Sequence, residues 1–325
     1  MTATTRSFAK INLGLRIGSS RPDGFHQLLT VYQTIGLFDV IRVSVARGSG
    51  IKILCADPRV PQDESNTCFR IAEKGMAALR AKGRVVIEIE KRLPIQGGLG
   101  GASANAVASL LALELAVRKP ISPAERLRIA AEVGSDLPLF LVGGAVLGVG
   151  RGEQVYPLPD LPATACVVIT PEIGVSTPKA FAEWDRTLQS RAKLTASHAS
   201  DRMNELGGGL SAWLSELYSS APSSFVERRG RAGNPLLRLD RAGIENDFEQ
   251  VVFPEYPKLG EAKRALVRAG AKYASLSGSG STLYGLFAAR KDAVLAANRL
   301  RKAGWAAQTT STLTRAAYWR RVFAS

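Results

Sequence analysis

The chain has 325 residues, of which 46% are hydrophobic and 22% charged, a composition typical of globular proteins that disfavours a disordered or fibrous chain. Its formal charge of +15, from 43 basic and 28 acidic side chains, would attract nucleotides, phosphorylated metabolites or nucleic acid. Three scattered cysteines and two histidines disfavour a disulfide framework and a structural zinc site. No apolar run reaches the length of a membrane span, so the sequence predicts a cytoplasmic protein.

The first predicted strand, residues 7–17, alternates apolar and polar side chains with unusual regularity. Its odd-numbered side chains from residue 9 onward are apolar and share one face, so Lys10 and Asn12 share the other face. A lysine at such a position either faces solvent or belongs to a site. The strand alone leaves both interpretations open.

A Pro-Asp-Gly turn at residues 22–24 follows and places Phe25 beside His26. Further elements are expected in the order strand, strand, helix and strand, at residues 41–45, 51–54, 66–81 and 85–90. Because a hairpin precedes the first helix, this order predicts an α+β fold and not a regularly alternating doubly wound sheet.

A glycine-rich loop at residues 94–104 is the central feature of the sequence. It connects the strand at 85–90 to an Ala- and Leu-rich helix that ends near residue 117. Its four glycines leave no Cβ in the way of a ligand, and the helix N-terminus that follows favours an anion. The loop lacks the lysine of a P-loop and fits only half of a dinucleotide motif. It predicts a phosphate cradle; the alternative is a flexible connector without a ligand.

An acidic side chain, Asp136, lies between the helix at 122–133 and Pro138. A capping box at Ser122 and Glu125 predicts the start of that helix. Asp136 is either a helix cap or a base that faces the glycine loop. Composition does not decide between these two roles.

Three prolines between residues 157 and 162 suggest a boundary, so we expect an N-terminal domain at 1–160 and a C-terminal domain at 161–325. Strands and helices of the second half alternate around a Gly/Ser loop, which predicts a split βαβ arrangement of the ferredoxin-like type. Residues 187–243 lose periodicity and accumulate Ser, Gly and Arg. We expect them to form a mobile insertion with few core contacts that is dispensable for chemistry. Its arginines lack the interleaved aromatic side chains of a nucleic-acid surface.

Three motifs resemble, in order, those of the galactokinase, homoserine kinase, mevalonate kinase and phosphomevalonate kinase (GHMP) superfamily: residues 10–13, 94–103 and 276–280. Four shorter segments are similar to the branch of that superfamily that phosphorylates a cytidine diphosphate ester in the non-mevalonate isoprenoid route. They lie at residues 8–12, 22–26, 134–138 and 245–248. The resemblance covers residues 6–182 and 244–310.

The resemblance implies a two-domain fold, with an N-terminal ribosomal-protein-S5-like α/β domain and a C-terminal ferredoxin-like domain. It implies an ATP-dependent kinase that uses Mg²⁺ and phosphorylates the 2-hydroxyl of the ester, with Asp136 as the base and Lys10 assisting it. The ATP phosphates would be held by Pro94, Gly97, Gly98, Leu99, Gly100, Gly101, Ala102, Ser103 and Ala104. The substrate would be held by Asn12, Phe25, His26 and Phe181.

The loop departs from its models at Ala102 and Ala104, and Ser103 is the hydroxyl that it keeps. The resemblance therefore leaves the metal ligands open. Two other functions also stay open: a homoserine- or mevalonate-type kinase would share the loop, and a catalytically silent RNA-binding relative would use the +15 charge.

Overall fold

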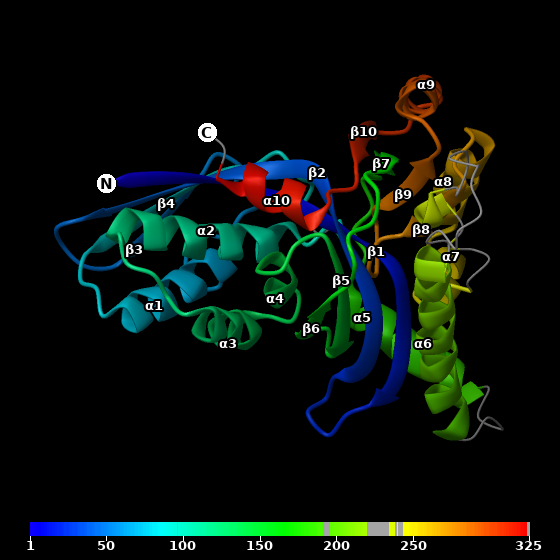
Figure 1. The fold of residues 1–325 in the computed structure, drawn as a ribbon, viewed down its shortest axis with the longest axis horizontal. Helices are drawn as coiled ribbons and strands as arrows, with labels where there is room; N and C mark the ends of the chain where they lie inside the picture. The colour runs from blue at the N-terminus through cyan, green and yellow to red at the C-terminus, as the bar shows by residue number, and fades with distance from the viewer. Residues whose placement is uncertain (96, 191–195, 220–233, 238, 240–242, 324–325) are drawn as a thin grey trace. The chain divides into compact units, whose positions relative to one another are not determined.

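The computed structural model describes residues 1–325 except 96, 191–195, 220–233, 238, 240–242 and 324–325 (Figure 1). The chain forms two compact units, each assembled from separated segments. Unit 1 consists of Met1–Ile11, Tyr32–Asp160 and Leu313–Ser325, and unit 2 of Asn12–Val31 and Leu161–Thr312. One of the passages of the chain between the units lies at residues 160 and 161. The sequence did not predict that residues 12–31 belong to the second unit and the C-terminal residues to the first.

Unit 1 is built on a mixed sheet with the strand order β3-β4-β2-β5-β6, in which β1 also pairs with β2. Strand β3 runs parallel to β4, and β4 runs antiparallel to β2. Their bounds are β1 Thr2–Ser20, β2 His26–Ala46, β3 Ile51–Cys55, β4 Arg84–Glu90, β5 Ala145–Gly150 and β6 Gln154–Pro157. Both β1 and β2 extend into unit 2. The mixed sheet confirms the expected α+β class.

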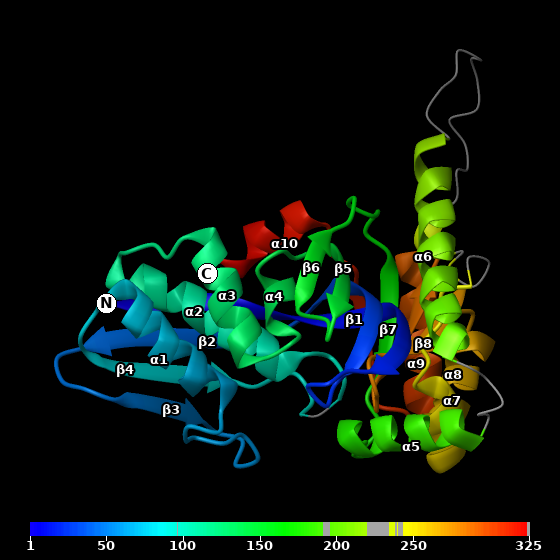
Figure 2. The same cartoon turned by 90° about the horizontal axis from the view of Figure 1, so that it is seen from below.

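Helices α1 to α4 of unit 1 pack together, and α1 contacts both α2 and α3 (Figures 1 and 2). The bounds of the helices of this unit are α1 Thr67–Leu79, α2 Gly101–Val117, α3 Pro123–Val133, α4 Leu137–Phe140 and α10 Arg315–Val322. The Ser122 hydroxyl accepts a hydrogen bond from the Glu125 N–H at the start of α3, as the capping box predicts. Gly75 allows α1 to approach α2, since a Cβ there would lie 2.8 Å from Leu110 Cδ1.

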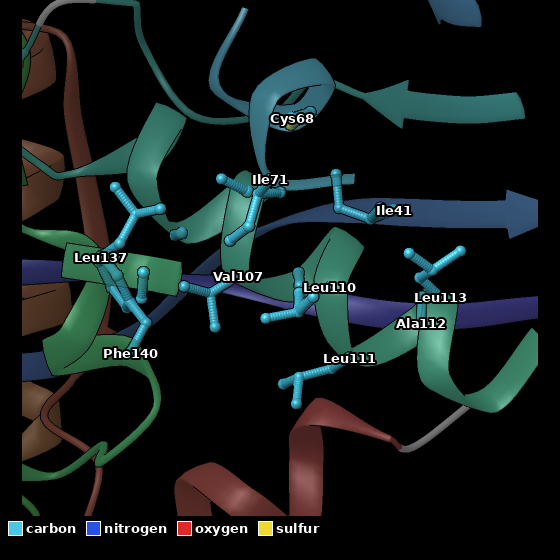
Figure 3. Packing of buried hydrophobic residues seen from close by; sticks show 14 of the residues in the cluster. Ile41, Cys68, Ile71, Val107, Leu110, Leu111, Ala112, Leu113, Leu137 and Phe140 are labelled. Atoms are coloured by element: carbon cyan, nitrogen blue, oxygen red, sulfur yellow. The ribbon is translucent and has the colours of Figure 1, made fainter. Parts of the chain in front are cut away.

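Apolar side chains of these helices and of the sheet form one core (Figure 3). Leu110 and Leu113 from α2 and Ile71 from α1 are fully buried, as is Ile41 from β2. Phe140 from α4 belongs to the same cluster. Helix α2 is therefore fixed along its length, and the glycine loop that precedes it is attached to a rigid element.

Unit 2 contains an antiparallel sheet with the strand order β10-β7-β9-β8. Helices α8 and α9 contact this sheet and each other. The elements are β7 Ala165–Ile169, α5 Thr177–Ser190, α6 Ala196–Ser219, the short 3₁₀ helix η1 Pro235–Leu237, α7 Glu249–Glu255, α8 Pro257–Arg268, β8 Tyr273–Leu276, β9 Leu283–Phe287, α9 Arg290–Lys302 and β10 Ala307–Ser311. A β-α-β-β-α-β order with this pairing is the expected ferredoxin-like arrangement.

The segment expected to be an insertion with few core contacts contributes buried side chains, so that expectation was wrong for its described part. Leu206, Leu210 and Trp213 of α6 are buried, and so is Leu236 of η1. The Trp213 Nε1–H donates a hydrogen bond of 3.1 Å to the Pro235 carbonyl. Residues 191–195, 220–233, 238 and 240–242 lie outside the described residues. In the part of the chain that is described, no helix is both long and apolar enough to cross a membrane.

The burial of α6 predicts that Trp213→Ala destabilises the protein. Trp213 is 3% exposed, and removal of a buried aromatic side chain typically costs about 3–5 kcal/mol. We expect the urea midpoint, followed by circular dichroism, to fall clearly. Ser211→Ala, on the exposed side of the same helix, should change the unfolding free energy by about 0.5 kcal/mol or less. An unchanged midpoint for Trp213→Ala would show that α6 contributes little to the stability of the core.

Candidate active site

The entry to the glycine loop is anchored by a buried carboxylate of β2. Asp39 is fully buried and accepts three hydrogen bonds, from Lys91 Nζ at 2.5 Å, Arg92 N at 2.6 Å and Leu93 N at 2.7 Å. Lys91 Nζ also lies 3.4 Å from the place that a Cβ on Gly101 would take. The anchored segment thus brings an ammonium group to the first residue of α2.

The loop itself approaches strand β1 closely. The Lys10 N–H donates a hydrogen bond of 3.0 Å to the Leu99 carbonyl. Gly100, the N-cap of α2, has a φ of 68°, a left-handed conformation that favours glycine. A Cβ on Gly100 would lie 3.1 Å from Lys10 Cε and 3.0 Å from Phe140 Cζ. The loop therefore needs glycine here both for its backbone conformation and for the space beside Lys10.

Lys10 and Asp136, which the sequence places on separate elements, form an ion pair. Lys10 Nζ lies 3.3 Å from Asp136 Oδ2. The lysine side chain is nearly buried, at 4% exposed, whereas that of Asp136 is 32% exposed. The other carboxylate oxygen, Oδ1, accepts a hydrogen bond of 3.0 Å from the Tyr32 hydroxyl. A partly exposed carboxylate is thus held next to a cation and beside the loop.

The cap interpretation of Asp136 disagrees with its geometry. Asp136 stands at the N-cap position of α4, but its side chain makes no capping hydrogen bond and its backbone is helical, with φ −83° and ψ −8°. A capping side chain normally accepts a bond from an N–H of the first turn, from a residue with extended backbone. The carboxylate instead faces Lys10 and Tyr32.

The first turn of α2 carries the hydroxyl that the loop retains. Ser103 is half-buried and Ala102 is exposed, while Ala104 is buried and its N–H donates to the Gly100 carbonyl at 2.8 Å. Among the described residues, no group of three or more His, Cys, Asp or Glu side chains could hold a metal ion. The Ser103 hydroxyl is an oxygen ligand of the kind that Mg²⁺ accepts beside phosphate and water oxygens.

In unit 2, the tip of the β1–β2 hairpin holds Phe25 in an exposed position. The Phe25 N–H donates to Asp23 Oδ1 at 3.2 Å, and its carbonyl accepts from Arg21 N at 2.7 Å. Phe25 is 50% exposed. Phe25 is therefore not a core residue, and its ring offers a face for stacking.

His26 and Phe181 lie against each other. Their rings stack with centroids 4.8 Å apart and an interplanar angle of 10°. The His26 Nε2 lies 2.7 Å from Asp185 Oδ1, one turn further along α5. Phe181 also meets Phe248 edge to face at 5.0 Å. The structure thus brings together two of the residues predicted for the substrate, and adds Asp185 as a partner that the sequence did not reveal.

Asn12 is held inside the hairpin. It is buried, and its Nδ2 donates a hydrogen bond of 2.8 Å to Thr30 Oγ1, which in turn donates to the Gly14 carbonyl at 2.9 Å. This network fixes the orientation of the Asn12 amide. Its role toward a substrate stays a prediction.

The second glycine loop, residues 277–280, is supported by the segment at 245–249. Asn246 Nδ2 donates to the carbonyls of Leu276 and Gly278 at 2.9 and 2.8 Å. Glu249 Oε1 accepts from the Leu276 N–H at 2.9 Å. Two of the segments whose resemblance was noted separately therefore form one structure in unit 2.

Comparison with known proteins assigns the class. Models of the GHMP kinase N-terminal domain and the GHMP kinase C-terminal domain match residues 66–144 and 225–305. A crystal structure of 4-(cytidine 5'-diphospho)-2C-methyl-D-erythritol kinase superposes with a TM-score of 0.69 at 28% identity, covering 95% of this chain and 98% of that one. A homoserine kinase from Cytophaga hutchinsonii, at 20% identity and a TM-score of 0.70, shares the fold. The fold and its glycine loop are those of a GHMP kinase.

Curated relatives narrow the class to one family. The 4-diphosphocytidyl-2-C-methyl-D-erythritol kinase of Solibacter usitatus is 41% identical over 88% of this chain and 81% of the relative. The enzyme of the same name from Acaryochloris marina is 35% identical over 92% of each chain. The chain belongs to the 4-diphosphocytidyl-2-C-methyl-D-erythritol kinase family.

The contact between Gly100 and Lys10 predicts that Gly100→Ala weakens nucleotide binding. The added Cβ would displace Lys10 or the loop, so we expect the ATP dissociation constant, measured by calorimetry, to rise by about tenfold or more. Gly50→Ala is the matched control, since Gly50 also has a positive φ, 90°, but nothing lies within 4 Å of its Cβ position. Equal ATP affinity for the two variants would show that the loop is a connector.

Proposed function

We propose that this protein transfers the γ-phosphoryl group of ATP to the 2-hydroxyl of 4-diphosphocytidyl-2-C-methyl-D-erythritol. The observation that carries the proposal is the Lys10–Asp136 pair beside the glycine loop. Sequence relatives named for this kinase support the choice of substrate. A catalytically silent RNA-binding relative would not need a buried lysine paired with a carboxylate at such a loop.

The reaction requires positioning, charge stabilisation and removal of one proton. The hydroxyl oxygen attacks the γ-phosphorus, the bond from that phosphorus to the β–γ bridging oxygen breaks, and ADP leaves. The hydroxyl proton passes to the Asp136 carboxylate and from there to solvent. Lys10, nearly buried, holds its ammonium group 3.3 Å from this carboxylate and would help to order the attacking hydroxyl.

The phosphates of ATP are assigned to the loop from Pro94 to Ala104. The N–H groups at the start of α2 favour an anion there, and the ammonium of Lys91, which pairs with Asp39, lies beside Gly101. Mg²⁺ would be held by phosphate oxygens and by the Ser103 hydroxyl in the first turn of α2. It would neutralise the charge that develops on the phosphates. Because ATP is the co-substrate and the three cysteines are unpaired, we place the enzyme in the cytoplasm.

The cytosine is assigned to unit 2. Phe25 offers an exposed ring face at the hairpin tip, and the buried His26 and partly buried Phe181 form a stacked aromatic pair. A base that stacks on such rings also needs hydrogen-bond partners at its edge, which distinguish one base from another. We assign that role to His26 and Asn12 from the family resemblance; Asn12 is held by Thr30, and His26 Nε2 lies 2.7 Å from Asp185 Oδ1.

Asp136→Asn tests the base. We expect kcat to fall about a hundredfold or more, as for loss of a general base, with the KM for ATP little changed. Asp57→Asn is the control, because Asp57 also pairs with a basic side chain, Arg59, but in a local surface contact. Near-normal turnover by Asp136→Asn would contradict the assignment of Asp136.

Competition by nucleotides tests the substrate. CMP should raise the melting temperature and compete with the ester, whereas UMP should do so far less, because its base edge leaves polar groups of the site unpaired. Phe25→Ala should raise the KM for the ester more than the KM for ATP. Phe323→Ala, at another exposed phenylalanine, should change neither. Equal protection by CMP and UMP, or efficient turnover of mevalonate or homoserine, would exclude this substrate.

A further inference from the structure

The hydroxyl of Tyr32 contacts the carboxylate proposed as the base. Tyr32 lies on β2, and its hydroxyl donates a hydrogen bond of 3.0 Å to Asp136 Oδ1. Lys10 Nζ lies 3.3 Å from the other oxygen, Oδ2, and 5.6 Å from the centre of the Tyr32 ring. Each carboxylate oxygen therefore has its own partner, and the two partners fix the plane of the carboxylate.

Tyr32 itself is rigidly placed. It is 2% exposed, and a Cβ on Gly152 would lie 2.4 Å from its hydroxyl oxygen. The missing side chain of Gly152 thus makes the space that the hydroxyl occupies. Because Tyr32 is buried and closely packed beside Gly152, its hydroxyl oxygen has little freedom to move away from Asp136.

The hydroxyl also keeps its proton. Burial, and then the negative charge of Asp136, raise the pKa of Tyr32 well above its ordinary value. A tyrosine whose pKa is raised in this way is protonated at neutral pH and acts as a hydrogen-bond donor. It cannot itself serve as the base.

Asp136 depends on such partners because its own element restrains it poorly. Helix α4 has four residues, and the Asp136 side chain makes no capping bond to it. With about a third of the side chain exposed, rotation about its Cα–Cβ bond toward solvent, or of the carboxylate plane about Cβ–Cγ, would otherwise be easy. A base turned toward water loses its alignment with the reacting hydroxyl, and small misplacements of reacting groups lower rates strongly.

We propose that Tyr32 is a positioning residue that orients the Asp136 carboxylate for proton abstraction. The inference rests on the proposed role of Asp136 as the base. Tyr32 acts on Asp136 Oδ1 and leaves Oδ2, beside Lys10, as the oxygen directed to the acceptor hydroxyl. Loss of the Tyr32 hydroxyl should lower kcat and leave the KM values unchanged, because neither ATP nor the ester needs to contact it.

Tyr32→Phe removes the hydroxyl and keeps the ring. We expect kcat to fall about tenfold, which corresponds to about 1.4 kcal/mol, a typical loss for a hydrogen bond to a charged group. The KM values for ATP and for the ester should stay within about twofold. Thr5→Val is the matched control, because it removes another buried hydroxyl of unit 1, which donates to the Ala108 carbonyl at 3.0 Å. Its kcat should stay at the wild-type value.

A double-mutant cycle separates positioning from a merely structural role. If Tyr32 acts through Asp136, adding Tyr32→Phe to Asp136→Asn should lower the residual kcat by less than about twofold. A tenfold loss in both backgrounds, or a normal kcat for Tyr32→Phe when Asp136→Asn is impaired, would overturn the inference. Normal turnover by Asp136→Asn would instead reject the base itself. Melting temperatures of all variants identify any loss that comes from unfolding.

Discussion

The close contact between the glycine loop and the lysine of β1 is the constraint on which the candidate active site depends. Gly100 adopts a left-handed backbone and carries no side chain, so the stem of Lys10 passes within 3.1 Å of the place that a Cβ would take. The lysine head group is then in reach of Asp136. Phe140, at the end of the short helix that follows Asp136, touches the same place. One position without a side chain therefore sets the relative placement of the loop, the cation and the carboxylate.

In unit 2, a buried ion pair fixes one segment of the chain against another. The guanidinium of Arg16 donates to Asp247 Oδ1 at 2.8 Å, and Asp247 Oδ2 accepts from the Ile17 N–H at 2.9 Å. Asp247 is fully buried, so loss of either partner would leave an uncompensated charge, at a cost of about 3–5 kcal/mol. The pair attaches β1 to the segment that supports the second glycine loop.

The sequence was sufficient for features that depend on local pattern. Alternation along β1 placed Lys10 and Asn12 on the polar face, and the capping box located the start of α3. The glycine loop was found because it joins a strand to a helix. Tyr32 and Asp39 were not found, because their roles arise from contacts with residues about a hundred and about fifty positions away. The sequence signal that could have revealed Asp39 is a charged side chain within a largely apolar strand.

Two interpretations failed for identifiable reasons. A single acidic residue between a helix and a proline has the same sequence pattern whether it caps a helix or acts as a base. The cap interpretation of Asp136 could therefore be tested only from its contacts in the structure. In α6, Leu206, Leu210 and Trp213 do recur with helical spacing, but three successive glycines interrupt the pattern. Glycine costs about 1 kcal/mol relative to alanine in a helix, and burial of the apolar face overrides that preference.

The division of the chain between the units has a consequence for the order of folding during synthesis. Leu313, Tyr318 and Val322 belong to the core of unit 1, and the Tyr318 hydroxyl donates to the Phe140 carbonyl at 2.7 Å. These residues leave the ribosome after all of unit 2. Domains generally fold in the order in which they emerge, but here the unit that holds the loop, Lys10 and Asp136 is completed last. A chain that stops short of its final residues would carry every proposed catalytic group and still lack part of the core that holds them.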